Sequence, residues 1–337
     1  MKAYQVRSGA NIAGLQRAEV RAKELGPNDV RVAIRAVSLN YRDLMFARGE
    51  YIVSSKEPRI AACDGAGEVI EVGSQVKRFR TGDRVATTYF PKWIDGDATP
   101  YNTEGTLGAE VDGVLAEQLV INEEGLVTIP AHLDFVAAAS LPCAAVTAWN
   151  ALFVEGKLKA GGSVLLQGTG GVSIHALQLA HAAGAQVIIT SSSDAKLEKA
   201  RKLGADATIN YRTNPEWQDE VLRITDGRGV DVVLEIGGRD TLKRSLAAAR
   251  MGGVVAVIGG LSGWSSETEY MPLVGGAKRL VGIFVGSRKM FEDLNRVISA
   301  ARIHPVVDRT FTFDQAREAY EHLASGSHFG KVTIKIT

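Results

Sequence analysis

A glycine-rich turn between a strand pattern and a helix pattern constrains this chain more than any other feature. The turn, Gly168-Thr169-Gly170-Gly171, follows the apolar run Val164-Leu165-Leu166-Gln167. A helical pattern from Val172 to Ala183 comes next and is closed by Gly184. A strand, a tight turn and a helix in this order predict one half of a βαβ unit.

The residue types of the turn suit a phosphate group. Gly168 permits the tight turn, and Gly170 lets a pyrophosphate approach the backbone. The free N–H groups at the start of the helix, from Gly171 and Val172 onward, favour its negative charge. Ser173 replaces the third glycine of the fingerprint and is still small enough for close packing. An isolated turn of this kind could be an ordinary tight turn without a ligand. The neighbouring sequence therefore has to show whether it binds a phosphate.

The surroundings repeat the same alternation of apolar strands and helices. We expect strands at Ser163–Gln167, Gln186–Thr190, Ala207–Asn210, Val230–Leu234, Val254–Ile258 and Arg279–Val285, and helices at Val172–Ala183 and Asp194–Leu203. Six such strands predict an α/β fold with a doubly wound parallel sheet of the Rossmann type. In that context the turn predicts a dinucleotide site, with Gly259 as a further cofactor contact.

The end of the second strand predicts which dinucleotide is bound. Enzymes that use NAD carry Asp or Glu there to hold the ribose, whereas this chain has Ser191-Ser192-Ser193. With no carboxylate to repel a 2′-phosphate, and with Lys196 and Arg212 nearby, NADP(H) is preferred over NAD(H). Alternatively, Ser191 and Ser192 only cap the following helix.

The rest of the chain forms a second domain. Residues 1–130 contain short alternating strands and glycine-rich turns, which indicate a β-barrel. After Gly286 come helical patterns at Lys289–Ala301 and Asp314–Ala324 and a strand at Lys331–Ile336. These final elements are expected to fold back onto the first domain.

Charge and cysteine content exclude several classes of partner. The net charge is +1 with scattered Lys and Arg, so neither nucleic acid nor a membrane surface is an expected partner. No apolar run approaches 18 residues, and the start reads directly into a strand. Only Cys63 and Cys143 are present, without a disulfide framework. We expect a cytoplasmic protein.

Six stretches together carry a family resemblance. They are Ala36–Leu44, Asp64–Val69, Gly82–Val85, Leu141–Ala148, Gly170–Val172 and Leu203–Asp206. On them the whole chain resembles the medium-chain dehydrogenase/reductase superfamily, in its zinc-independent quinone oxidoreductase-like and zinc-type alcohol dehydrogenase-like branch. The resemblance implies a GroES-like β-barrel substrate domain (1–130, completed by 287–337), a Rossmann domain (131–286) and an active site in the cleft beside it. It also implies a homodimer, formed through the edge strand near Val281–Val285.

The zinc ligands of related enzymes are replaced here. Asn40 stands where the first cysteine would be, Cys63 where the histidine would be and Asp64 in place of the glutamate, while Cys143 keeps the third ligand position. Cys63, Asp64 and Cys143 could still hold zinc with one open position. The alternative is that the cysteines are small buried apolar residues. Zinc is not expected.

Similarity to quinone oxidoreductases indicates the pocket residues. Asn40 would donate a hydrogen bond to a substrate oxygen, and Tyr51 would orient the substrate or deliver a proton. Their alternatives are a turn residue and a surface aromatic. Asp43 is expected to brace the loop. By the same resemblance, cofactor contacts are expected at Thr147, Tyr211 and Lys331.

An aromatic stretch, Tyr89 to Gly96, predicts a wall for an apolar or aromatic carbonyl or quinone substrate, through Phe90 and Trp93. A loop packed on the barrel is the alternative. Phe284 is a further candidate substrate contact. The leading hypothesis is therefore a metal-free NADPH-dependent oxidoreductase that transfers hydride to a quinone or an α,β-unsaturated carbonyl. An alcohol dehydrogenase or aldehyde reductase, with or without zinc, and a non-catalytic NADPH-binding protein are the alternatives.

Overall fold

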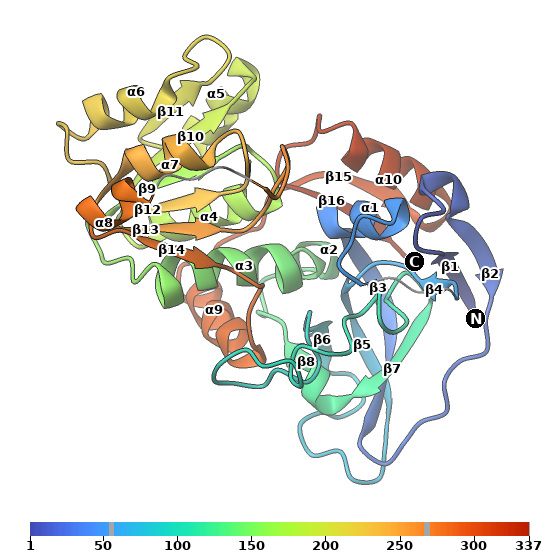
Figure 1. Ribbon diagram of the computed structural model, residues 1–337. Coiled ribbons are helices and arrows are strands. Elements are labelled where there is room, and N and C mark those ends of the chain that lie inside the picture. The colour runs from blue at the N-terminus through green and yellow to red at the C-terminus, as the bar shows by residue number, and fades with distance from the viewer. Residues whose placement is uncertain (54–56, 266–269, 337) are drawn as a thin grey trace. The chain divides into compact units, whose positions relative to one another are not determined.

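The computed structural model describes residues 1–53, 57–265 and 270–336 of the chain (Figure 1). The chain divides into two compact units. The first unit is Met1–Val146 with Gly286–Thr337, and the second unit is Thr147–Val285. Residues 131–146, placed in the Rossmann domain by sequence, group with the first unit, because α2 (Phe135–Ala139) packs against strands of its barrel.

The second unit forms, within the described residues, a six-stranded parallel sheet. Its strands in spatial order are β11 (Ala207–Asn210), β10 (Gln186–Ser191), β9 (Ser163–Gln167), β12 (Val230–Glu235), β13 (Ala249–Val257) and β14 (Arg279–Gly282). Its helices are η4 (Asn150–Glu155), α4 (Gly171–Ala182), α5 (Asp194–Lys202), α6 (Trp217–Ile224), α7 (Leu242–Ala248) and α8 (Met271–Gly275). The sheet order reverses at β9, as in a doubly wound dinucleotide fold. The predicted Rossmann architecture is thus confirmed.

The sheet is held by apolar side chains on its faces. The strands β9, β10 and β12 are buried along almost their whole length, as the continuous apolar runs predict. On one face, Trp217 and Val221 of α6 and Leu246 of α7 pack against Leu165 and Val233. The predicted sixth strand ends at Gly282 rather than at Val285. Val285 has φ of 54°, which a strand does not accommodate.

The described residues of the first unit form two sheets. The smaller has the order β2 (Gln16–Glu19), β1 (Lys2–Val6), β4 (Arg59–Ile60). The larger has the order β15 (Val307–Thr312), β16 (Lys331–Lys335), β3 (Asp29–Leu39), β5 (Asp64–Val72), β6 (Arg84–Thr87), β8 (Leu126–Thr128), with β7 (Gln118–Asn122) also paired to β3. The helical segments besides α2 are η1 (Ile12–Gly14), α1 (Tyr41–Arg48), η2 (Glu123–Gly125), η3 (Leu141–Ala145), α9 (Arg288–Ala300), η5 (Phe313–Gln315) and α10 (Ala316–Ala324), while α3 (Val146–Trp149) spans the boundary.

Strand β3 organises this sheet because it pairs with different neighbours along its length. Residues Asp29–Ala33 pair with β7, and residues Ala36–Leu39 pair with β16 from the end of the chain. Strand β5 runs along the other side of β3. Figure 1 shows the red β16 beside the blue β3 and α1. The strand near the end of the chain therefore extends the sheet at β3.

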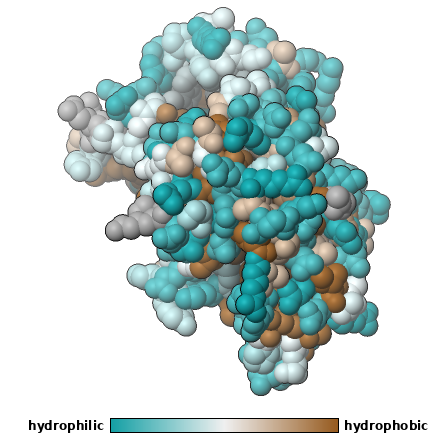
Figure 2. All heavy atoms as spheres, turned by 90° about the vertical axis from the view of Figure 1, so that its right-hand side faces the viewer, coloured by the Kyte–Doolittle hydropathy of each residue, from teal (hydrophilic) through white to brown (hydrophobic). Residues whose placement is uncertain are grey.

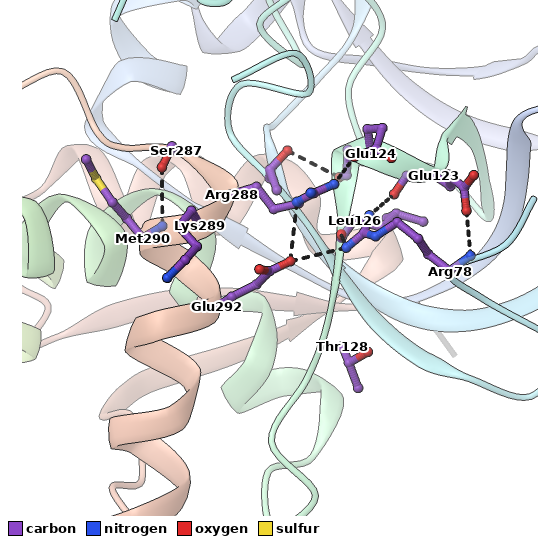
Figure 3. A network of polar contacts seen from close by, with 12 residues as sticks. Arg78, Glu123, Glu124, Leu126, Thr128, Ser287, Arg288, Lys289, Met290 and Glu292 are labelled. Atoms are coloured by element: carbon purple, nitrogen blue, oxygen red, sulfur yellow. Dashed lines mark hydrogen bonds and ion pairs between the residues drawn. The ribbon is translucent and has the colours of Figure 1, made fainter. Parts of the chain in front are cut away.

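Helix α9 joins the first unit through ion pairs. Arg288 contacts Glu124 and Glu292, and Arg78 bonds to Glu292 at 3.3 Å and to the carbonyl oxygen of Leu126 at 3.1 Å (Figure 3). Burial of Arg78 is the largest cause that lowers its pKa, followed by the charge of Arg288. The carboxylates between these two arginines offset their repulsion and attach the helix to the β7–β8 region.

The surface is mixed in hydropathy. Hydrophilic side chains cover much of the face in Figure 2, with hydrophobic groups scattered between them, which is the ordinary distribution on a folded protein. Within the described ranges, no helix is both long enough and apolar enough to cross a membrane.

Candidate active site

Three strand ends meet in the first unit. Strand β3 lies between β16 and β5, and the register pairs Leu39 with Val332 and Ser38 with Asp64. The last residues of β3 and the first residues of β16 and β5 are therefore adjacent. This register places Asn40, Asp64 and Lys331 together, although they are far apart in sequence. All three are at most 8% exposed.

Lys331 holds Asn40 in one orientation. Its ammonium group donates to Asn40 Oδ1 at 2.5 Å and to the carbonyl oxygen of Leu39 at 2.7 Å, and it lies 4.0 Å from the Asp64 carboxylate. An ammonium group only donates hydrogen bonds, so the Asn40 atom that faces it must be the amide oxygen. The amide nitrogen of Asn40 then points to the Cys63 sulfur at 3.5 Å. Lys331, expected as a cofactor contact, lies in this polar cluster.

The two cysteines and Asp64 form the other side of the cluster. The Cys63 thiol donates to Asp64 Oδ1 at 3.0 Å, and the Cys143 backbone N–H donates to Asp64 Oδ2 at 3.1 Å. Burial is the main cause that raises the pKa of Cys63 well above its ordinary value, and its hydrogen bond with the Cys143 side chain and the charge of Asp64 act in the same direction. Cys63 is therefore a neutral thiol at pH 7. Ala62 just before it has φ of 63°, a left-handed conformation that is costly for a non-glycine residue.

Asp43 braces the turn at Asn40. Its Oδ2 accepts the Asn40 backbone N–H at 2.8 Å, and its Oδ1 accepts Arg42 Nη1 at 3.0 Å. Burial is the largest influence on the Asp43 pKa and raises it, against the opposing effects of Arg42 and of the Asn40 N–H. Because both of its oxygens are engaged, Asp43 positions the start of α1 rather than acting as a base.

Tyr51 lies with Tyr89, a residue that the sequence analysis did not select. Their hydroxyl groups are 2.6 Å apart, and the Arg42 guanidinium lies 4.7 Å from the Tyr51 ring and 5.4 Å from the Tyr89 ring. Arg42 stands inside the matched stretch Ala36–Leu44, but a charged residue on a helical pattern gives no signal of burial. The contact between Tyr51 and Tyr89 joins loops 38 residues apart, so no local pattern could reveal it.

Phe90 and Trp93 pack inside the first unit. They are 1% and 4% exposed, and their ring centroids lie 5.9 Å apart. Trp93 Nε1 donates to the Gly96 carbonyl oxygen at 3.0 Å, which closes the loop on itself. Both side chains are therefore packed within the first unit, in the stretch where the sequence predicts a substrate wall.

The glycine-rich turn of the second unit has the form that a pyrophosphate needs. Gly168 has φ of 68°, and Gly170 is the N-cap of the twelve-residue helix α4. Ser173 donates to the Gln167 carbonyl oxygen at 2.6 Å, which anchors the first turn of the helix to the end of β9. The first backbone N–H groups of an α-helix have no carbonyl partner within the helix, so the start of α4 suits an anion.

The glycine-rich turn is stabilised by hydrogen bonds between a buried amide, Gln167, and a buried carboxylate, Glu235. Gln167 Nε2 donates to Glu235 at 2.9 Å, and its Oε1 accepts the backbone N–H groups of Ile236 and Gly237 at 3.0 and 3.1 Å. Glu235 also accepts the Gly238 N–H at 2.8 Å. The network ties the last residue of β9, next to Gly168, to the end of β12. The sequence analysis did not identify it because the two residues are 68 positions apart.

The end of β10 presents serines. Ser193 is the N-cap of α5 and accepts the Lys196 N–H at 3.4 Å, and Ser191 accepts the Ser193 N–H at 3.3 Å. The capping role that was the alternative for Ser191 and Ser192 thus belongs to Ser193. The nearest carboxylate along the chain, Asp194, accepts a hydrogen bond from the Asn210 side chain at 2.7 Å.

The remaining predicted contacts are spread over the second unit. Thr147 is buried, Gly259 follows β13, Tyr211 and Arg212 are exposed after β11, and Phe284 is 40% exposed beyond β14.

Comparison with known families decides the classification. The alcohol dehydrogenase GroES-like domain matches residues 26–131, and the zinc-binding dehydrogenase domain matches residues 171–300. The chain belongs to the medium-chain dehydrogenase/reductase superfamily. Its members are NAD(P)H-dependent oxidoreductases, and this chain is one of them.

Relatives carry both alcohol dehydrogenase and quinone oxidoreductase names. A zinc-type alcohol dehydrogenase-like protein of Schizosaccharomyces pombe is 44% identical over 93% of this chain and 92% of its own length. A quinone oxidoreductase of Pseudomonas aeruginosa is 36% identical over 74% of this chain and 70% of its own length. The crystal structure of a putative alcohol dehydrogenase from Sinorhizobium meliloti has 42% identity and a TM-score of 0.91, covering 100% of this chain and 99% of that one.

The candidate zinc ligands of this dehydrogenase/reductase are Cys63, Asp64 and Cys143, with Asn40 where a first cysteine would stand. Asn40 offers a neutral amide where a thiolate ligand would stand, and the Cys63 thiol donates a hydrogen bond to Asp64 Oδ1. The Lys331 ammonium already lies beside Asp64, where a second cation would be repelled. Among the residues that the structure describes, no three His, Cys, Asp or Glu side chains are grouped as metal ligands.

Proposed function

We propose that this chain is an NADPH-dependent reductase that transfers hydride to a quinone or an α,β-unsaturated carbonyl without a metal ion. The observation that carries the proposal is the contact between Lys331 and Asn40. A metal-free enzyme must polarise the substrate oxygen with hydrogen-bond donors. Lys331 holds the Asn40 amide oxygen, so that the amide nitrogen is left to donate to the substrate.

Asn40, Lys331 and Tyr51 have separate roles in the proposed reaction. Bound NADPH supplies a hydride from C4 of its nicotinamide. Asn40 Nδ2 has two N–H groups, of which one points to Cys63, so the second can donate to the substrate oxygen. Charge that develops on this oxygen is stabilised by the nearby Lys331 ammonium. Tyr51 supplies the proton that completes the reduction.

The test is steady-state NADPH oxidation by chelator-treated protein with an ortho-quinone, an enone and a simple aldehyde offered in parallel. We expect turnover of the quinone or the enone, undiminished by chelation. Turnover of the aldehyde alone, restored by added zinc, would contradict the proposal and make Cys63 and Cys143 ligands.

A substitution at Asn40 tests the donor role directly. Asn40→Asp keeps the size of the side chain but replaces the donating nitrogen with an acceptor, so kcat should fall by about 100-fold, the usual effect of losing one oxyanion donor. The exposed residue Asn214 offers the matched control Asn214→Asp, which should leave turnover unchanged.

The preference for NADP(H) rests on the end of β10. Ser191 to Ser193 offer hydroxyl groups and no carboxylate, and the nearest acid, Asp194, is engaged with Asn210. The bases Lys196 and Arg212 follow within the next elements. A 2′-phosphate would meet hydrogen-bond donors rather than a repelling charge.

We further propose a cytoplasmic homodimer. β14 is an edge strand of the described sheet, and exposed apolar side chains lie on it and on α8, among them Leu280, Met271 and Val274. Exposed apolar surface beside an unpaired edge favours pairing with a second copy. Cys63 and Cys143 are not joined in a disulfide, which suits a reducing compartment. Sedimentation velocity should show twice the monomer mass, and a monomer at micromolar concentration would contradict the dimer.

A further inference from the structure

Tyr51, Tyr89 and Arg42 form a cluster of two tyrosines and an arginine in the first unit. Tyr51 and Tyr89 share a hydrogen bond of 2.6 Å between their hydroxyl groups, and the Arg42 guanidinium lies against both rings. Tyr89 is 4% exposed, whereas Tyr51 is only partly buried. Tyr51 is therefore the more accessible of the two phenols.

Arg42 is a buried cation with unused donors. It is 8% exposed, and its Nη1 donates to Asp43 Oδ1 at 3.0 Å and to the Leu107 carbonyl oxygen at 2.8 Å. Over the described part of the chain, Arg42 Nε and Nη2 are buried and have no hydrogen-bond partner. Buried guanidinium donors are costly to leave unpaired, and contact with two ring faces offsets only part of that cost. The arrangement suits a negative charge that forms on the phenols.

The cluster shares the neighbour Cys63 with Asn40. The charged or titratable neighbours that act on Tyr51 are Arg42 from α1, Tyr89, Cys63 before β5 and Cys143 of η3. The same groups act on Tyr89, with Tyr51 in place of itself. Burial is the largest cause that raises the pKa of both phenols, and Arg42 opposes it. Both phenols are therefore protonated at pH 7 and able to donate.

We propose that Tyr51, Tyr89 and Arg42 form a proton relay in which Tyr89 reprotonates Tyr51 and Arg42 stabilises the phenolate. The inference rests on the proposed function. After hydride has reached the conjugated acceptor, the Tyr51 O–H bond breaks and its proton forms the new C–H or O–H bond of the reduced substrate. The Tyr89 O–H bond then breaks, and its proton forms a new O–H bond on Tyr51. Once the product has left, a proton from water binds the Tyr51 oxygen while the Tyr51 proton returns to Tyr89. In sum, NADPH and one proton from solvent reduce one substrate molecule.

The hydrogen bond between the phenols permits this order. The two hydroxyl oxygens are 2.6 Å apart, and only one of their two hydrogens lies in the hydrogen bond between them. When Tyr89 is the donor, the hydrogen of Tyr51 remains available to the substrate. A phenolate on either residue stays within reach of the Arg42 charge. Tyr51 is thus the catalytic residue of the three, and Tyr89 and Arg42 act through it.

A double-mutant cycle separates a relay from a structural contact. Tyr51→Phe removes the acid and should lower kcat for an enone by about 100-fold, within the range for general acid catalysis. Tyr89→Phe keeps the ring and its contact with Arg42 but removes the relay proton, and should lower kcat by about tenfold. In the Tyr51→Phe background, Tyr89→Phe should have no further effect, because Tyr89 acts only through Tyr51.

The pH profile provides a second readout. In the wild type, kcat should fall at high pH with the titration of the coupled phenols, and this limb should move in Tyr89→Phe and disappear in Tyr51→Phe. Arg42→Lys, which retains the charge, should preserve more activity than Arg42→Gln. Tyr101→Phe is the matched control, because Tyr101 is 73% exposed in the same unit. Its kinetics should equal those of the wild type.

The outcomes distinguish this inference from the proposed function. If the wild type reduces neither quinone nor enone, the proposed function fails. If the wild type turns over an enone, but the effects of Tyr51→Phe and Tyr89→Phe on kcat multiply or Tyr89→Phe leaves the pH profile unchanged, only the relay is overturned.

Discussion

Lys331 and Asn40 are 291 residues apart in sequence, yet the ammonium nitrogen of one lies 2.5 Å from the amide oxygen of the other. The contact exists because β16 pairs with the end of β3 in a fixed antiparallel register. A one-residue slip would turn Lys331 to the opposite face of the sheet. The C-terminal strand thus determines the hydrogen bonding of a residue near the start of the chain.

Lys331→Met tests this dependence. Methionine has similar length and no charge, so Asn40 Oδ1 loses its donor and Asp64 loses its nearby cation. We expect kcat/KM for an enone to fall by 10- to 100-fold, the effect of losing a charged hydrogen bond worth about 1.5–3 kcal/mol. Lys335→Met, at the exposed end of the same strand, is the control. Equal kinetics in the two variants would show that Lys331 does not orient Asn40.

Ser192→Asp tests the basis of coenzyme choice. A carboxylate at the end of β10 would repel the 2′-phosphate of NADPH and could hold the ribose of NADH. The KM for NADPH should rise at least about tenfold, for a repulsion of about 1.4 kcal/mol or more, whereas the KM for NADH should stay constant or fall. Ser192→Ala controls for loss of the hydroxyl. A parallel rise in both KM values would mean that Ser192 does not lie near the adenosine ribose.

Glu235→Gln tests the support behind the glycine-rich turn. The carboxylate is fully buried and accepts from Gln167, Gly238 and Thr241, so an amide nitrogen in its place would face donors. We expect a stability loss of about 2 kcal/mol and a Kd for NADPH, measured by fluorescence titration, several times higher. The exposed Glu198→Gln should change neither quantity. A lower melting temperature with unchanged Kd would limit the network to a structural role.

The second unit could be predicted almost entirely from the sequence because its signals are local. Apolar runs, glycine stops and the turn at Gly168 each act within a few residues, and strands β9 to β12 appear close to where the pattern placed them. Strand β13 instead begins at Ala249 rather than at Val254. The sixth strand was extended too far because Ile283 to Val285 are apolar. Their backbone, not their hydropathy, takes them out of the sheet.

The candidate site could be predicted only in part because its contacts are long-range. Asn40 and Tyr51 were selected by resemblance, but Tyr89 was seen only as one aromatic residue of a loop. Lys331 was expected to bind the cofactor, and its place beside Asn40 follows from strand register, which hydropathy does not specify between residues so distant. Burial of Arg42 depends on the packing of whole loops, which no spacing of residues encodes.

Asp231→Asn tests a carboxylate that links the N-terminal ends of three neighbouring strands in the parallel sheet. Asp231 accepts the Ser163 N–H at 2.8 Å, Arg228 Nη2 at 2.8 Å and Arg250 Nε at 2.5 Å, and so joins the starts of β9, β12 and β13. Burial raises the Asp231 pKa, but these hydrogen bonds outweigh it and hold the pKa well below its usual range. Because the side chain is partly exposed, we expect the substitution to cost about 1–2 kcal/mol at pH 7.

The sign of the pH dependence follows from the lowered pKa of Asp231. A carboxyl group whose pKa is lower in the folded chain stabilises it above the unfolded-state pKa of about 3.9, and this contribution is lost as the pH falls toward the folded-state value. Wild type and Asp231→Asn should therefore differ most near neutral pH and converge below about pH 4. Thermal unfolding followed across pH measures this, with the exposed Asp240→Asn as control. A difference that stays constant down to pH 3 would show that the hydrogen bonds at Asp231 do not depend on its charge.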